Sequence, residues 1–157
     1  MATNVKWGAV SVFDAIPTAT LNSFPSGTAA ANHALGGAID NTPAVLGAMY
    51  GVLEIVLASF ITAAANTSPY INVWLIPSFD GTNYGTTNGS TGGAGPTQPG
   101  YFGGLITPPA GAPVKVMHVP LVLPPSLFKV QINSQLGVAW PASGNTCKLY
   151  AYGEQGS

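Results

Sequence analysis

Charge is scarce in this chain of 157 residues. Only 6% of its residues are charged, against roughly 25% in an ordinary soluble domain. The four basic residues are all lysines, and the formal net charge is −1. Proteins that bind nucleic acid neutralise phosphates with clustered arginine and lysine. We therefore expect no nucleic-acid partner.

Cysteine and histidine are nearly absent as well. With Cys147 as the one cysteine, neither an intrachain disulfide nor a thiolate metal cluster can form. We expect its thiol to be inert and to face the core from the last strand. The two histidines, His33 and His118, do not have the spacing of a metal motif, and no phosphate-binding glycine motif is present. The sequence predicts no metal and no cofactor.

The carboxylates are too few and too scattered to suggest a reaction site. Nothing in the sequence places two of them together as a glycosidase pair would require. Asp40 and Asp80 are explained by turns, where aspartate bonds its own backbone. We therefore predict no catalytic residue and no enzyme. Glu54, in an apolar run, is interpreted as an interface carboxylate paired with a lysine or with backbone amides, with subunit registry as the alternative.

One apolar segment is long enough to cross a membrane. Residues 45–65 contain a single charge, Glu54, which at the bilayer midplane would cost about 2.5–3.5 kcal/mol. Its β-branched residues and glycines favour extended chain over helix. We predict a strand over residues 44–58 and no membrane partner. The first ten residues lack the basic and apolar regions of a secretory signal.

What the sequence does contain is a series of short apolar runs separated by Gly, Pro and Asn. This spacing is typical of an all-β sandwich or barrel, and we predict one domain over residues 1–157. In the run Leu127–Asn133, alternation places Phe128, Val130 and Ile132 inward and Lys129, Gln131 and Asn133 outward. The predicted strands cover residues 5–16, 44–58, 70–76, 114–123 with a break at Pro120, 127–133, 138–140 and 146–152.

Two long segments lie outside these strands. Residues 1–43 read as a first strand followed by a connecting arm, in which we expect one turn of helix near residues 29–35. Residues 80–113 read as a long loop rich in glycine and proline. A chain with so few charges has little protection against self-association, so these segments are expected to touch partners through aromatic side chains and one histidine. The predicted contacts are Trp7, Phe13, Phe24, His33, Tyr84, Tyr101 and Phe102.

Four stretches together resemble a known family. They are SFDGTNY at residues 78–84, VPLVLPPSLFKVQINSQLGVAW at 119–140, SGNTCKLYAYGE at 143–154 and AANHALGGAIDNTPAVLGAMYGVLEI at 30–55. Together these stretches look like the small jelly-roll cement or decoration proteins of tailed bacteriophages. The likeness covers about residues 30–154, and its motifs are motifs of fold and not of catalysis.

The resemblance implies a jelly-roll-like antiparallel β-sandwich on the outer capsid surface of a virion. It also implies the major capsid protein as partner, self-association as a homotrimer or homodimer, and stabilisation of the shell by clamping neighbouring capsomers. A tail or baseplate structural protein of the same fold is one alternative. A carbohydrate-binding module with a platform of Trp7, Trp74 and Trp140 is another, although strand patterns favour core packing for Trp74 and Trp140.

Overall fold

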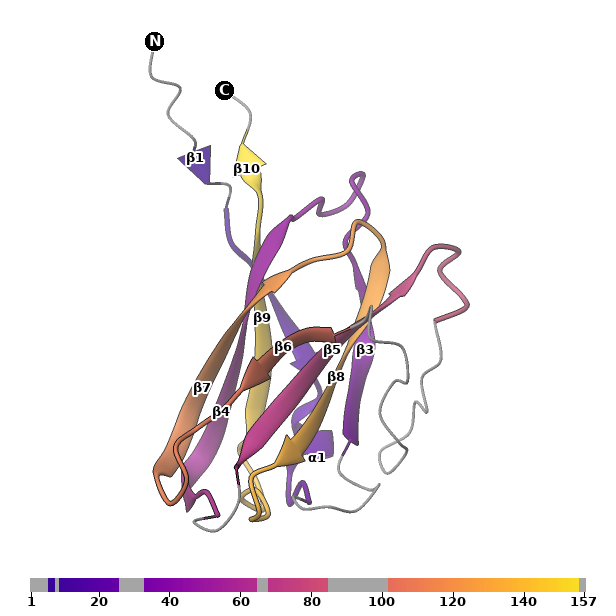
Figure 1. The fold of residues 1–157 in the computed structure, drawn as a ribbon. Coiled ribbons are helices and arrows are strands. Elements are labelled where there is room, and N and C mark those ends of the chain that lie inside the picture. Colours follow the sequence, from indigo (N-terminus) through magenta and orange to yellow (C-terminus); the bar gives the residue numbers. More distant parts are fainter. Residues whose placement is uncertain (1–5, 8, 26–32, 65–67, 85–101, 156–157) are drawn as a thin grey trace.

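The protein is an all-β sandwich of two antiparallel sheets, each with four strands (Figure 1). The computed structural model describes residues 6–7, 9–25, 33–64, 68–84 and 102–155. Sheet I has the strand order β2-β9-β4-β7, and sheet II has the order β3-β8-β5-β6. The predicted all-β sandwich is confirmed.

Apart from the strands, the described residues contain one helix, of four residues. Short β1 pairs with β10 to form a separate ribbon beyond the sandwich, at the end where both termini lie (Figure 1). The elements are β1 Lys6–Trp7, β2 Ser11–Ile16, α1 Thr18–Leu21, β3 His33–Asp40, β4 Tyr50–Thr62, β5 Tyr70–Ser78, β6 Phe102–Ile106, β7 Pro113–Val122, β8 Leu127–Gln135, β9 Thr146–Tyr152 and β10 Glu154–Gln155.

The hydrophobic core lies between the two sheets. Alternate side chains of each strand point into it, as expected for stacked sheets. The predicted inward residues of β8 are all fully buried, and Cys147 is 1% exposed on β9. The buried hydrophobic residues from these two strands and the long strand β4 are Phe128, Val130, Ile132, Cys147, Leu149, Ala151, Leu53, Ile55 and Leu57.

A buried asparagine ties two loops together at one end of the sandwich. The Asn41 side chain donates to the carbonyl oxygens of Ala48 at 2.8 Å and Pro124 at 2.7 Å, and its oxygen accepts the Ala48 N–H at 2.8 Å. Asn41 is fully buried. Burial of a polar side chain costs stability unless such partners are present. Through these bonds Asn41 links both loops.

The predicted turn role of two aspartates agrees with their hydrogen bonds. Asp80 Oδ1 accepts the backbone N–H groups of Asn83 at 2.7 Å and Thr82 at 2.9 Å. These bonds hold the pKa of Asp80 well below its usual range. Asp40 Oδ1 accepts the Thr42 hydroxyl at 2.7 Å and its N–H at 3.0 Å.

The segment from residue 18 to residue 40 differs from the prediction of a connecting arm. Its helix is Thr18–Leu21, and residues 33–40 form strand β3 instead of the helical turn expected near residues 29–35. The part from 26 to 32 lies outside the described residues. Glycine and alanine have low β propensity, but pairing with β8 from His33↔Asn133 to Asp40↔Leu127 imposes the strand.

Strand β4 begins later than predicted, at Tyr50 instead of residue 44. The chain first forms a turn in which the N–H groups of Val45, Leu46 and Gly47 all point to the Thr42 carbonyl oxygen at 3.0–3.1 Å. Gly47 has φ of +60°, a conformation that favours glycine.

No helix in the described part of the chain has the length and hydropathy to span a bilayer.

Strand β7 is continuous through Pro120, where a break was expected. Pro120 is in register with Val52 of β4. Because β7 lies at the edge of sheet I, the N–H that proline lacks is not needed for the ladder.

Two further predictions of secondary structure need correction. Residues 102–106, expected within the long loop, form β6 and pair with β5; residues 85–101 lie outside the described part. Residues 138–140, expected as a strand, form none. There Trp140 is 3% exposed, as predicted for a core residue, and its indole N–H donates to Ser134 Oγ at 3.1 Å.

Candidate functional site

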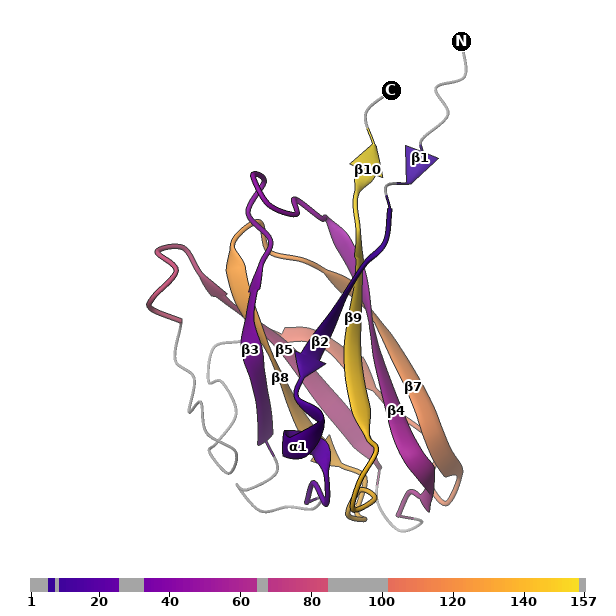
Figure 2. The same ribbon diagram turned by 180° about the vertical axis from the view of Figure 1, so that it is seen from behind.

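The outer face of sheet I exposes large apolar side chains to solvent. Val12, Val116 and Val122 are 54%, 50% and 74% exposed. Strand alternation places them on the same face as Val52 of β4 and Tyr150 of β9. Figure 2 views the molecule from the side of this sheet. Contiguous exposed apolar patches are typical of interaction surfaces.

A single polar row crosses this apolar face. The strand register aligns Asp14 of β2 with Lys148 of β9, Lys148 with Glu54 of β4, and Glu54 with His118 of β7. The row therefore contains one outward side chain from every strand of sheet I. Its formal charges alternate in sign from Asp14 to Glu54, and His118 adds a positive end when protonated.

Glu54 is the most connected member of the row. Its Oε2 lies 2.9 Å from His118 Nε2, and its Oε1 accepts the Tyr150 hydroxyl at 3.0 Å. The bond with His118, then the bond from Tyr150, and the positive charge of Lys148 lower the pKa of Glu54. The same carboxylate raises the pKa of Tyr150. The predicted lysine or amide partners of Glu54 are therefore corrected to a histidine and a tyrosine.

We expect Glu54 to make stability depend on pH in the acid range. Because its pKa is lower in the folded chain, the carboxylate contributes stability above its ordinary value of 4.5 and loses it as pH falls below that value. Glu54→Gln is expected to cost about 1 kcal/mol at neutral pH and less in acid. Thermal unfolding of both proteins across pH tests this, with Tyr150→Phe expected to fall between them. A difference between wild type and Glu54→Gln that is the same at every pH would contradict the assignment.

The outer face of sheet II has a different character. Trp74 is half-buried and alternates with the buried Val73 and Leu75 on β5, so it faces outward and is not in the predicted core position. Its ring centroid lies 5.8 Å from that of His33. Lys129 Nζ lies 4.2 Å from the ring centroid of Tyr84, a cation–π contact. Gln131 points outward from the sandwich as predicted, yet it is fully buried, and its amide atoms have no hydrogen-bond partner among the described residues.

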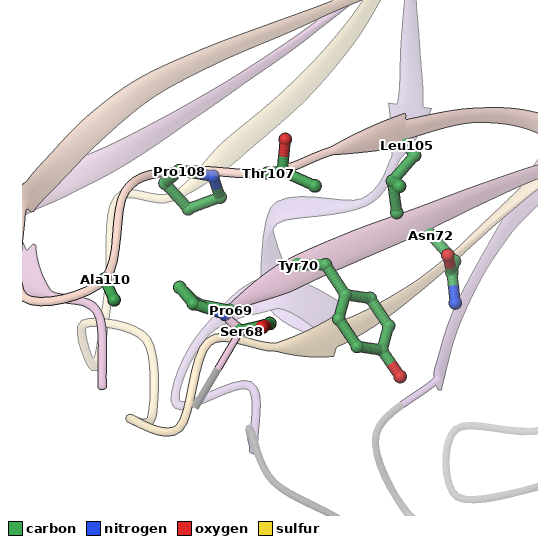
Figure 3. Close-up of a pocket in the computed structure, with 8 residues that line it drawn as sticks. All are labelled: Ser68, Pro69, Tyr70, Asn72, Leu105, Thr107, Pro108 and Ala110. Atoms are coloured by element: carbon green, nitrogen blue, oxygen red, sulfur yellow. The ribbon is translucent and has the colours of Figure 1, made fainter. Parts of the chain in front are cut away.

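Two open grooves flank sheet II. The first has a volume of about 710 Å³ and lies beside the start of β5 and the end of β6, where Figure 3 shows the rings of Tyr70 and Pro108 and the side chain of Leu105. Asn72 adds an amide at one side. The second groove, of about 830 Å³, lies between β6 and β7. Its apolar lining residues include Leu75, Phe79, Phe102, Pro120, Leu121, Val122 and Leu123.

The predicted contact residues fall in different environments. Phe102 is 50% exposed on the rim of the second groove, and Tyr84 is half-buried. His33 is 7% exposed, and Phe13 is half-buried against the core. They do not form one cluster.

The prediction of Phe24 as a contact is corrected. Phe24 is fully buried and packs edge-on against Trp140, with ring centroids 5.2 Å apart, so it belongs to the core. The side chain of Trp7 and all of Tyr101 lie outside the described residues. The exposed valines of sheet I were missed, although Val12 and Val122 stand at outward positions of alternating strands.

No family model, curated protein or solved structure matches this chain. Across the described ranges, no three His, Cys, Asp or Glu side chains lie together as a possible metal site. The features of the molecule that bear on function are therefore the two outer faces of the sheets and the two grooves.

Proposed function

We propose that this protein is a structural virion protein that binds the outer surface of a bacteriophage capsid and clamps neighbouring capsomers. The observation that carries this proposal is the apolar outer face of sheet I, with Val122 74% exposed, in a chain with only 6% charged residues. Such a face is stable in water when another protein covers it. In a protein that stays in an assembly, a neighbouring subunit covers such a face permanently.

We also propose that the sandwich is a jelly roll. Its support is the strand order, 2-9-4-7 in one sheet and 3-8-5-6 in the other. Eight strands distributed over two sheets by Greek-key connections define this architecture. Viral capsid proteins and lectins both use it, so the fold agrees with the resemblance to decoration proteins without deciding the function.

A clamp needs at least two contact surfaces, and we assign them as follows. The second groove, with Phe79 85% exposed and Phe102 50% exposed, is the proposed contact for the major capsid protein. The outer face of sheet I is the proposed contact for another copy of the chain, and the two surfaces meet at Pro120 and Val122, which line the second groove as well. Symmetry repeats each modest contact in every copy, which raises the total binding energy.

A carbohydrate-binding module is the second candidate, and the first groove is the observation that favours it. Tyr70 presents a ring there, Asn72 supplies an amide on the same strand, and Thr107 lines the opposite side of the groove. This combination of one ring and hydrogen-bonding groups suits a sugar ring. A tail or baseplate protein of the same fold would carry the same surfaces.

Co-sedimentation with phage shells tests the main proposal. The protein is expected to bind expanded empty capsids at a fixed ratio to the major capsid protein, with unexpanded shells as the comparison. Phe102→Ser is expected to weaken binding about tenfold or more, because aromatic residues in a groove often dominate interface energy. The matched control is Phe60→Ser, at a residue 67% exposed and outside this groove.

Three outcomes would contradict the proposal. Absence of binding to either shell, with the protein recovered in tail fractions, would indicate the baseplate alternative. Binding to a soluble glycan that Tyr70→Ala abolishes would indicate the carbohydrate-binding module. Equal losses for Phe102→Ser and Phe60→Ser would reject the second groove as the capsid contact.

A further inference from the structure

The charges in the polar row of sheet I match those of a second copy of the row when the strand order of that copy is reversed. Read from β2 to β7, it runs Asp14, Lys148, Glu54, His118. When a second copy of this sheet faces the first and is turned about an axis parallel to the strands, the strand order reverses across the interface. Asp14 then faces the partner's His118, and Lys148 faces the partner's Glu54. All four positions place acidic groups opposite basic or protonatable ones.

The other two-fold arrangement lacks this match. If the axis ran across the strands over the row, every member would face its own copy, so Lys148 would meet the partner's Lys148 and Glu54 the partner's Glu54. If the axis ran across the strands elsewhere, the charges would face apolar rows. Like charges and unpaired charges both oppose association. The charge pattern therefore selects the axis parallel to the strands.

The apolar rows beside the polar row fit the same axis. The next row holds Val12, Tyr150, Val52 and Pro120 in strand order. Reversal places Val12 against the partner's Pro120 and Tyr150 against the partner's Val52. Every contact of this row is then between apolar surfaces, as the core of an interface requires.

We infer that the outer face of sheet I packs against the same face of a second copy of this chain, about a two-fold axis parallel to the strands between β9 and β4. This inference deepens the proposed function, because it specifies the self-association on which the clamp rests. Edge-to-edge pairing through β7 is opposed by Pro113 and Pro120 on that strand. Pairing through the β7 edge is therefore disfavoured relative to packing through the face.

The area of the outer face of sheet I limits the expected affinity of the dimer. Four strands about 4.8 Å apart, each contributing about seven residues at about 3.4 Å, give a footprint of roughly 450 Å². A standard stable interface buries about 800 Å² of accessible surface per partner, and the accessible area of a sheet face exceeds its footprint. We expect a dimer with a micromolar dissociation constant.

Sedimentation velocity over micromolar concentrations, with the full chain and no capsid, measures this dimer. Val12→Asp places a carboxylate against the partner's Pro120, and Pro120→Lys places an ammonium against the partner's Val12. Each variant alone is expected to raise the dissociation constant at least tenfold. An equimolar mixture is expected to restore a heterodimer, because one contact becomes Asp against Lys and the symmetric contact stays Val against Pro.

Leu105→Asp is the matched control, since Leu105 is 48% exposed on sheet II, and it is expected to leave the dimer intact. Circular dichroism of each variant reports folding. A wild-type monomer or trimer, unchanged dimerisation of both single variants, or a mixture that stays monomeric although each variant is folded would overturn the inference. A dimer that binds no capsid would contradict only the proposed function, and a monomer that binds capsid would contradict only the dimer.

Discussion

Gly36→Ala is expected to lower the free energy of unfolding by about 3 kcal/mol or more. A Cβ at this position would lie 1.7 Å from the carbonyl oxygen of Ala15 and 2.9 Å from its carbonyl carbon. Both atoms belong to backbone, so no side chain can rotate away to make room. The contact lies where edge strand β3 of sheet II meets edge strand β2 of sheet I, and a methyl group there forces the two sheets apart.

The neighbouring glycine provides the control. A Cβ on Gly37 would meet no atom within 4 Å, and alanine in a strand has less backbone entropy to lose than glycine. Gly37→Ala is therefore expected to change the free energy of unfolding by no more than about 0.5 kcal/mol, in the stabilising direction. Thermal unfolding should separate the two variants by about 6–12 °C for a domain of this size. Equal melting temperatures would show that β2 and β3 have room to move apart.

Asn41→Ala is expected to cost about 3 kcal/mol, the second large effect. The substitution removes three hydrogen bonds at once. It also leaves the Ala48 N–H and the carbonyl oxygens of Ala48 and Pro124 without this partner beneath the surface. A buried backbone group that loses its partner keeps its full desolvation cost.

The test is chemical unfolding of Asn41→Ala beside Asn83→Ala. Asn83 is exposed, and among the described residues its side chain donates to Asp80 alone, at 2.6 Å. Asn83→Ala is expected to lose no more than about 0.5 kcal/mol. A loss as small in Asn41→Ala would mean that water replaces the missing amide, and a changed slope of the transition would mean that the loops open before the sheets do.

Local chemistry made part of this fold predictable. The alternation from Phe128 to Ile132 identified the core face of β8, because a strand turns every second side chain to the same side. Asp80 was predictable as a turn residue because its carboxylate reaches the backbone two and three residues on. Cys147 was predictable as a buried thiol for the same reason of alternation. Each of these inferences needs only residues close together in the chain.

The parts that failed depend on partners distant in the chain. Residues 33–40 contain little β propensity, and only the register with β8 shows that they form an edge strand. Trp74 alternates with Val73 and Leu75, and since Trp74 and Ile76 make its own side of β5 largely apolar as well, alternation alone does not say which side is the core. The row from Asp14 to His118 was invisible in the sequence, because four separate strands must be aligned before it exists.

The burial of Cys147 has a consequence for chemistry done on this protein. The thiol is 1% exposed, and burial raises its pKa far above the usual range. Alkylating and disulfide-forming reagents need an accessible thiolate, so Cys147 is not expected to react with them while the protein is folded. A cysteine introduced on any outer face becomes the one reactive handle of the molecule. Dyes, spin labels or cross-linkers can therefore be attached there with the natural cysteine left in place.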